Sequence, residues 1–369
     1  MGETILSGPK LTPLSFTDLD GWRDDTHAIA LAAFRRGAAV AADHPPKTRA
    51  LGTDAAALGA ILNRAAALPA PDDRAARAFF EHEFAPFAVT PPSGGAFYTG
   101  YYEPEVAGSL TATAEFTVPL YRTPEDLVEV GPDGHPPALD PSFRFARRSS
   151  AGLVEHPDRA AIMAGALAGR GLEIVWLADP VDAFFIHVQG AARIRLAGGR
   201  TLRVTYAAKS GHAYTPVGRI IADISGLARE QVTMPVIRRW LAEHPAEAGA
   251  VMARNRSYIF FREAAVDDPA LGPVAAAKVP LTPGRSLAVD RLVHTFHSPV
   301  WVETTLPSGE AFRHLTIAQD TGSAIVGPAR GDIFFGSGEA AGTIAGAMRG
   351  AGRFVVLLPR EREPKGSGP

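Results

Sequence analysis

Residues 317–338 read IAQDTGSAIVGPARGDIFFGSG. Two apolar, β-like runs are joined here by a glycine-rich loop, and each run has a carboxylate at its edge, Asp320 and Asp332, which lie 12 residues apart. Strand ends hold a side chain rigidly, and glycines let a bulky ligand approach the backbone. The pattern therefore suits a pair of acid–base groups. It suits equally a structural role, because Asp also caps turns in glycine-rich loops.

A third short apolar run, residues 286–290, also ends in an aspartate, Asp290. A barrel with crossing strands could bring three such strand ends to one cleft.

Two other motifs in this region are excluded. The Asp-Thr-Gly sequence at 320–322 is also found in aspartic proteases, but their chemistry needs two such carboxylates and the chain has no second copy. The glycines of 336–342 miss the spacing of a dinucleotide-binding loop and lack a βαβ context.

A pair of histidines, His294 and His297, lies between Asp290 and His314. A metal site is conceivable from these residue types. Pro299 and the irregular surrounding sequence favour a loop, in which paired histidines are expected to be solvated. We predict no metal and no cofactor, and the chain has no Gly-x-Ser-x-Gly elbow typical of serine hydrolases.

The composition excludes several classes of protein. The 369 residues contain no Cys, which excludes a disulfide scaffold, a Cys-ligated metal site and a thiol nucleophile. A net charge of −2 gives no general field to attract nucleic acid or an anionic membrane, so any partner must be recognised by a local site, and no nucleic-acid partner is expected. The length suggests two domains. No signal sequence or transmembrane segment is expected, and the tail after Arg360 is typical of disorder.

Hydrophobic periodicity and turn residues predict a helical N-terminal part and a β-rich remainder. Helices are predicted at 27–42, 54–68 (with Thr53 as N-cap), 72–84, 157–169, 216–224 and 235–254. Strands are predicted at 172–177, 183–188, 191–196, 201–206, 258–261, 286–289, 300–304, 315–319, 333–335 and 354–358.

Three polar–aromatic stretches could bind a sugar, which presents an apolar ring face and a rim of hydroxyls. They are Thr99-Gly100-Tyr101-Tyr102-Glu103, Val188-Gln189-Gly190 and the run from Tyr206 to Tyr214, which includes Lys209, Gly211 and His212. Core packing with satisfied hydroxyl groups is the alternative for the tyrosines.

Taken in order, five of these motifs resemble the MltA family of membrane-bound lytic murein transglycosylases and its C-terminal 3D domain, which is named for three aspartates. They are residues 99–104, 182–190, 206–214, 286–290 and 318–338. The chain departs from the family pattern at 293–297, where the family usually has Ile-Pro-Leu/Pro-Gly, and at Ala192, Ala208 and Ser210.

The resemblance implies a mainly β fold with N-terminal helices. A double-psi β-barrel (residues 1–105 and 232–360) would be interrupted by a second β-barrel domain (106–231), with the substrate in a groove between them and a disordered tail at 361–369. It further implies a monomer that acts on peptidoglycan glycan strands in the cell envelope, in the periplasm or at the outer-membrane face.

The implied activity is that of a peptidoglycan lytic exotransglycosylase. It would cleave the β-1,4 bond between N-acetylmuramic acid and N-acetylglucosamine and form a 1,6-anhydro ring. The family's catalytic acid falls on Asp332, and the other two aspartates fall on Asp320 and Asp290. The substrate-binding positions would be Thr99, Gly100, Tyr101, Tyr102, Gln189, Gly190, Lys209, Gly211, His212 and Tyr214.

In this mechanism the C6 hydroxyl of the substrate is the nucleophile, so one carboxyl can act first as acid and then as base. The pKa of Asp332 should then lie well above the reference value of about 3.9. Burial and the charge of Asp320 are expected to raise it. A water-using glycoside hydrolase and a non-catalytic peptidoglycan-binding module remain the alternatives.

Overall fold

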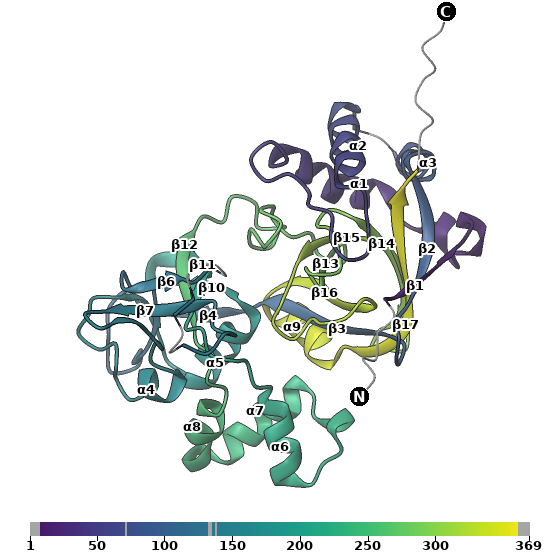
Figure 1. Cartoon of the computed structure of the whole chain (residues 1–369). Coiled ribbons are helices and arrows are strands. Elements are labelled where there is room, and N and C mark those ends of the chain that lie inside the picture. Colours follow the sequence, from purple (N-terminus) through teal and green to yellow (C-terminus); the bar gives the residue numbers. More distant parts are fainter. Residues whose placement is uncertain (1–7, 71, 132–134, 137–138, 361–369) are drawn as a thin grey trace, which may run out of the picture. The chain divides into compact units, whose positions relative to one another are not determined.

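The computed structural model describes residues 8–70, 72–131, 135–136 and 139–360 (Figure 1). The chain divides into two compact units. Unit 1 consists of the described residues of Met1–Tyr102, Pro269–Gly336 and Thr343–Pro369, and unit 2 of those of Glu103–Asp268 and Ser337–Gly342. The predicted disordered tail, 361–369, lies outside the described residues.

Unit 1 is built on one sheet that closes on itself. Its strands run in the order β1-β2-β17-β14-β15-β13-β16-β3, and an additional pairing joins β3 to β17. The strands β17, β14, β15, β13, β16 and β3 therefore form a closed ring, in which β13 and β15 run parallel. The bounds are β1 Lys10–Pro13, β2 Phe84–Thr90, β3 Ala96–Glu103, β13 Ser286–Val289, β14 Pro299–Thr305, β15 Ala311–Asp320, β16 Arg330–Ser337 and β17 Arg349–Pro359.

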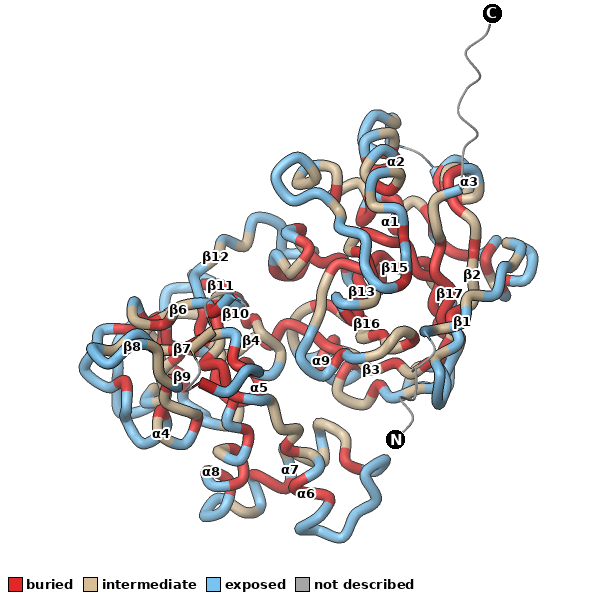
Figure 2. The backbone as a smooth tube through the Cα atoms, in the orientation of Figure 1, coloured by how far each residue is buried: buried red, intermediate tan, exposed pale blue. Residues whose placement is uncertain are grey.

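The strand β13 and most of β14 are buried, and β14 has an apolar core on each of its faces. Val300 and Val302 of β14 belong to one apolar cluster, while Trp301 between them belongs to another that includes the N-terminal helices. This alternation follows from the period of two along a strand. All four residues of β13 are buried (Figure 2). The sequence predicted β13, β14, β15, β16 and β17, because their apolar runs are short and bounded by turn residues.

Three helices cover one face of the barrel: α1 (His27–Arg35), α2 (Ala55–Ala67) and α3 (Asp73–Glu83). The prediction of Thr53 as a cap is wrong: the Asp54 side chain accepts hydrogen bonds from the amides of Ala56 and Ala57. A carboxylate suits this place, because it also interacts favourably with the helix dipole. The first helix ends earlier than predicted, and a 3₁₀ turn, Arg36–Ala39, follows it.

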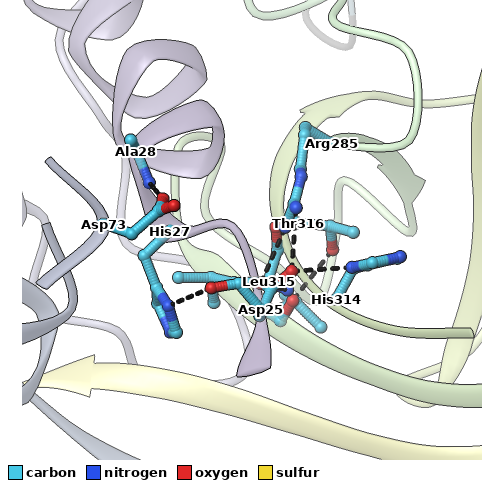
Figure 3. A network of polar contacts seen from close by, with 9 residues as sticks. Asp25, His27, Ala28, Asp73, Arg285, His314, Leu315 and Thr316 are labelled. Atoms are coloured by element: carbon cyan, nitrogen blue, oxygen red, sulfur yellow. Dashed lines mark hydrogen bonds and ion pairs between the residues drawn. The ribbon is translucent and has the colours of Figure 1, made fainter. Parts of the chain in front are cut away.

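A buried ion cluster fixes the segment before α1 to the barrel (Figure 3). The Asp25 carboxylate accepts two hydrogen bonds from the Arg285 guanidinium, at 2.7 and 2.8 Å. It also accepts one from His314 Nδ1 at 2.7 Å and one from the Leu315 amide at 2.8 Å. Burial alone would raise the pKa of Asp25, but the hydrogen bond from His314 and the hydrogen bonds and charge of Arg285 hold it well below its usual range.

Unit 2 contains a second ring of strands. The four-stranded sheet β12-β11-β10-β4 is joined to the pair β5-β9 by two isolated bridges. Ser109, just after β4, bridges to Trp176 of β9, and Arg122, just after β5, bridges to Phe261 of β12. A three-stranded sheet, β6-β7-β8, completes the unit. The bounds are β4 Glu105–Ala107, β5 Val118–Tyr121, β6 Leu127–Glu129, β7 Phe145–Ser149, β8 Gly152–Val154, β9 Glu173–Leu177, β10 Ala191–Arg195, β11 Thr201–Lys209 and β12 Ile259–Ala264.

One predicted strand, 183–188, is wrong, because these residues lie within the helix α5 (Pro180–Gln189). Both ends of α5 have residues typical of helix termini. At the N-terminus the Asp179 side chain accepts a hydrogen bond from the Val181 amide, and at the C-terminus Gly190 adopts the left-handed conformation at φ 81°. The run Ala-Phe-Phe-Ile-His-Val is apolar throughout, so its periodicity could not separate a buried strand from a buried helix.

The boundary at which the chain returns to unit 1 also differs from the prediction. We expected it at 231/232, where helical sequence resumes, whereas it lies at 268/269. The helices α6 (Val217–Ser225), α7 (Met234–Glu243) and α8 (Pro245–Ala253) share an apolar cluster with α5, and β12 pairs with β11. These contacts keep the segment up to Asp268 in unit 2.

Two α-helices remain among the described residues. The predicted helix at 157–169 is only the short α4 (Arg159–Met163), and the glycine-rich stretch after β16 forms α9 (Gly338–Ala347). Among the helices of the described residues, none is both long and apolar enough to cross a membrane.

Candidate active site

Two of the three aspartates lie on the strands that flank β13. Ala288 of β13 is paired with Asp320 of β15 on one side and with Asp332 of β16 on the other. Residues paired across neighbouring strands project from the same face of a sheet. The barrel therefore brings together two carboxyl groups that are 12 residues apart in the sequence, with only the small side chain of Ala288 between them.

Asp332 is half-buried and is held by a neighbouring strand. The hydroxyl of Thr99 on β3 donates a hydrogen bond to its Oδ1 atom. Burial raises the pKa of Asp332, and the positive charge of Arg330 and the hydrogen bond from Thr99 oppose that rise. The direction agrees with that expected for a general acid.

Asp320 accepts three hydrogen bonds. Its Oδ2 accepts from the hydroxyl of Tyr101 at 3.0 Å, and its Oδ1 accepts from the amides of Thr321 at 2.8 Å and Ala276 at 3.3 Å. Burial nevertheless raises the pKa of Asp320 to about 6, and the charge of Asp332 adds to the rise. The two carboxyls are therefore close enough to interact electrostatically.

Replacing Asp320 by Asn should stabilise the protein in a pH-dependent way. The folded-state pKa of about 6 exceeds the ordinary value of 3.8, so ionisation of this carboxyl destabilises the folded state. The penalty is absent below about pH 4 and grows as the pH rises through 6. We expect Asp320→Asn to raise the free energy of unfolding by roughly 1–3 kcal/mol at pH 8, with little change at pH 3.5. Urea denaturation at both pH values measures this, and an equal effect at the two would contradict it.

Asp290 occupies a different environment from the other two aspartates. It is buried directly after β13, where its Oδ1 accepts from the Leu292 amide at 2.9 Å and its Oδ2 from the Gly327 amide at 2.8 Å. Both oxygens thus join the loop after β13 to the loop before β16. These contacts favour a role in shaping the loops over direct contact with a substrate.

The predicted sugar-binding residues of β3 lie beside the two carboxyls. Thr99 contacts Asp332, and Tyr101 contacts Asp320. Gly100 has a packing role: a Cβ there would lie 2.6 Å from the ring of Phe335 and 2.8 Å from Cα of Ala345 in α9. Tyr102 is buried.

The remaining predicted sugar-binding residues belong to unit 2, and several have structural roles there. Gly190 ends α5, and Gly211 has φ 93°, with the carbonyl oxygen of Phe145 where a Cβ would project. His212 is buried and donates from Nε2 to the carbonyl of His156 at 2.6 Å. The other three, Gln189, Lys209 and Tyr214, are half-buried.

The histidines His294 and His297 are buried, so the expectation that they are solvated is wrong. His294 Nε2 lies 2.8 Å from the carbonyl oxygen of Pro328, and burial lowers the pKa of each ring to about 4. His314 belongs to the Asp25 cluster instead. The described residues contain no group of three or more His, Cys, Asp or Glu side chains arranged to hold a metal ion.

Sequence reasoning missed Arg330 altogether and named Glu103 only as part of a polar–aromatic stretch. Arg330 precedes Asp332 by two positions on β16, and donates to Thr99. Glu103 is buried and binds Arg193 and Arg203, which lie directly opposite each other on β10 and β11. Two facing arginines in an apolar hairpin require an anion, so their spacing could have revealed the need for a partner such as Glu103.

Comparisons with known proteins match most of the chain. The model of the MltA specific insert domain matches residues 97–262, and that of the 3D domain matches residues 285–358. A membrane-bound lytic murein transglycosylase A from Escherichia coli (strain K12) is 30% identical over 273 residues, which are 72% of this chain and 66% of that protein. The matched region thus spans just under two thirds of the length of this relative.

Solved structures match over nearly the whole chain. The crystal structure of a membrane-bound lytic murein transglycosylase from Agrobacterium tumefaciens is 45% identical, with a TM-score of 0.89 and coverage of 95% of this chain and 98% of that chain. The crystal structure of E. coli MltA with bound chitohexaose has a TM-score of 0.66 at 24% identity and covers 98% of each chain, which shows a shared fold. These matches confirm the predicted fold class, mainly β with N-terminal helices and a double-psi β-barrel.

Proposed function

Since the chain belongs to the MltA family of lytic murein transglycosylases, we propose that it cleaves peptidoglycan glycan strands between N-acetylmuramic acid and N-acetylglucosamine with formation of a 1,6-anhydro ring. The observation that carries this proposal is the Asp332 carboxyl, held by Thr99 on a barrel strand with its pKa raised by burial. A carboxyl in that state can still hold a proton when substrate binds.

In the proposed reaction, Asp332 gives its proton to the glycosidic oxygen as the bond from that oxygen to the anomeric carbon breaks. The C6 hydroxyl oxygen of the same muramyl residue bonds to the anomeric carbon, and Asp332, now a carboxylate, takes the hydroxyl proton. The leaving sugar regains its 4-hydroxyl, and the carboxyl ends the cycle protonated. One residue thus performs both proton transfers, whereas ordinary glycosidases use two.

Asp320 is proposed to stabilise the positive charge that develops at the anomeric carbon. It lies across Ala288 from Asp332, and its pKa of about 6 leaves it largely ionised at neutral pH. An oxocarbenium-like transition state is favoured by a fixed negative charge nearby. Asp290 is proposed to support the site through the loops that it joins.

The substrate class is supported by the relatives. The E. coli protein of the same fold was crystallised with chitohexaose, and the E. coli relative is named a membrane-bound murein transglycosylase. We propose by analogy that this chain acts on murein in the cell envelope. Of the predicted sugar-binding residues of β3, Thr99 and Tyr101 would act mainly by holding the two carboxyls in place, since their hydroxyl groups donate to Asp332 and Asp320.

Mass spectrometry of the soluble products from purified murein sacculi tests the reaction. A transglycosylase releases muropeptides that end in 1,6-anhydromuramic acid, whereas a hydrolase releases reducing ends that are one water heavier. We expect the anhydro products. Reducing products would support a water-using pair formed by Asp320 and Asp332, and bound but uncut sacculi would indicate a glycan-binding module.

A further inference from the structure

A chain of two hydrogen bonds leads from Arg330 through Thr99 to Asp332. Nη2 of Arg330 donates to Oγ1 of Thr99 at 2.6 Å, and the same hydroxyl donates to Oδ1 of Asp332. We infer that Arg330, acting through Thr99, is a positioning residue that forces the acid proton of Asp332 onto Oδ2. This inference rests on the proposed function of Asp332.

The direction of both hydrogen bonds follows from the chemistry of the groups. A guanidinium carries only donors, and a threonine hydroxyl has a single proton. Because Arg330 occupies an acceptor site of the Thr99 oxygen, the Thr99 proton is directed to Asp332, whose Oδ1 must accept it. A protonated Asp332 then carries its own proton on Oδ2. The acid therefore presents one defined oxygen to the glycosidic bond.

The geometry of the two strands holds this chain of bonds in place. Arg330 and Asp332 are two residues apart on β16, and Phe97 and Thr99 are two residues apart on β3, which neighbours β16 in the sheet. The Arg330 guanidinium lies over the ring of Phe97, 5.3 Å from its centroid, and donates from Nη1 to the carbonyl of Gly331. A cation stacked on an aromatic ring and fixed at two donors has little freedom to leave Thr99.

Other charged or titratable groups face this pair from three strands. They are Asp320 on β15, Tyr101 on β3 and Arg349 on β17, whose guanidinium lies 5.4 Å from the Phe97 centroid. Burial lowers the pKa of Arg330; the charge of Asp332 opposes that effect, and the charge of Arg349 adds to it. Arg330 is the cation that acts on Asp332, so its removal should leave the proton on Asp332 up to a higher pH.

Thr99→Val tests the inference with almost no change in side-chain volume. We expect kcat on murein to fall roughly ten- to a hundredfold, as for loss of a hydrogen bond to a charged group, with little change in KM. Thr99→Ser keeps the hydroxyl and should recover most of kcat.

Arg330→Met tests the charge of Arg330. The alkaline limb of the profile of kcat/KM against pH should move to higher pH by about one unit, because Asp332 must be protonated to act as the acid and would keep its proton longer without the neighbouring cation.

Arg313→Met is the matched control, because Arg313 is half-exposed and pairs with Asp20 at the surface of unit 1. It should leave both kcat and the pH profile unchanged. Equal losses in Thr99→Val and Thr99→Ser would overturn the inference, as would a wild-type kcat in Thr99→Val or an unmoved alkaline limb in folded Arg330→Met. If Asp332→Asn retained full turnover, the proposed function would fail instead, and the two failures are thereby distinguished.

Discussion

Replacing Asp332 by Asn is expected to reduce the release of anhydro-muropeptides from sacculi by at least about a thousandfold, since acid–base catalysis contributes up to about four orders of magnitude and both transfers use this group. Asn has nearly the same shape and can still accept the hydrogen bond of Thr99, so the barrel should be retained. It cannot give up or take a proton at any working pH. Single-turnover assays with purified sacculi measure the loss.

Asp320→Asn provides the comparison for that experiment. It makes the same chemical change on the other side of Ala288 and removes a charge without removing the proposed acid. We expect it to lower turnover less than Asp332→Asn and to leave the products anhydro-ended. If Asp320→Asn abolished turnover while Asp332→Asn did not, the assignments of the two aspartates would be reversed. Binding of both variants to sacculi should remain at the wild-type level.

The sequence predicted β13, β15 and β16 because each has a short apolar run bounded by glycine, proline or aspartate. It also placed Asp320 and Asp332 at strand edges. Their proximity could not be deduced from spacing alone, because it depends on β13 lying between β15 and β16, parallel to one and antiparallel to the other. The resemblance to a family supplied that step.

Other features depend on packing that local sequence does not specify. The helix α5 was taken for a strand because a uniformly apolar run lacks a period. His294 was expected in solvent, but its ring is buried and its Nε2 lies near a backbone carbonyl oxygen. The role of Arg330 was not predicted, because in sequence a single arginine in a glycine-rich loop cannot be distinguished from a solvent-exposed one. Its function depends on Thr99, which is 231 residues away in the sequence.

The Asp25 cluster is the clearest case of a long-range feature, and it leads to the largest expected effect on stability. Asp25 and Arg285 are 260 residues apart, and their side chains are buried. Asp25→Asn would leave the Arg285 guanidinium without its counter-charge. Breaking such a buried pair by removal of one partner costs about 3–5 kcal/mol. We expect a loss of that size at pH 7, measured by urea denaturation and by faster hydrogen exchange of the β15 amides, which are specific to unit 1.

Asp20→Asn is a matched control, since Asp20 pairs with Arg313 at 2.6 Å, as closely as Asp25 pairs with Arg285 at 2.7 Å, but both partners are exposed. An exposed pair contributes at most about 1 kcal/mol. The folded-state pKa of Asp25 is held below its unfolded value, so its stabilising effect is complete above about pH 5 and is lost as the pH falls through the folded-state value. The difference between wild type and Asp25→Asn should therefore be present at pH 7 and shrink in acid. Equal effects of Asp20→Asn and Asp25→Asn at pH 7 would show that the buried cluster contributes no more than a surface ion pair.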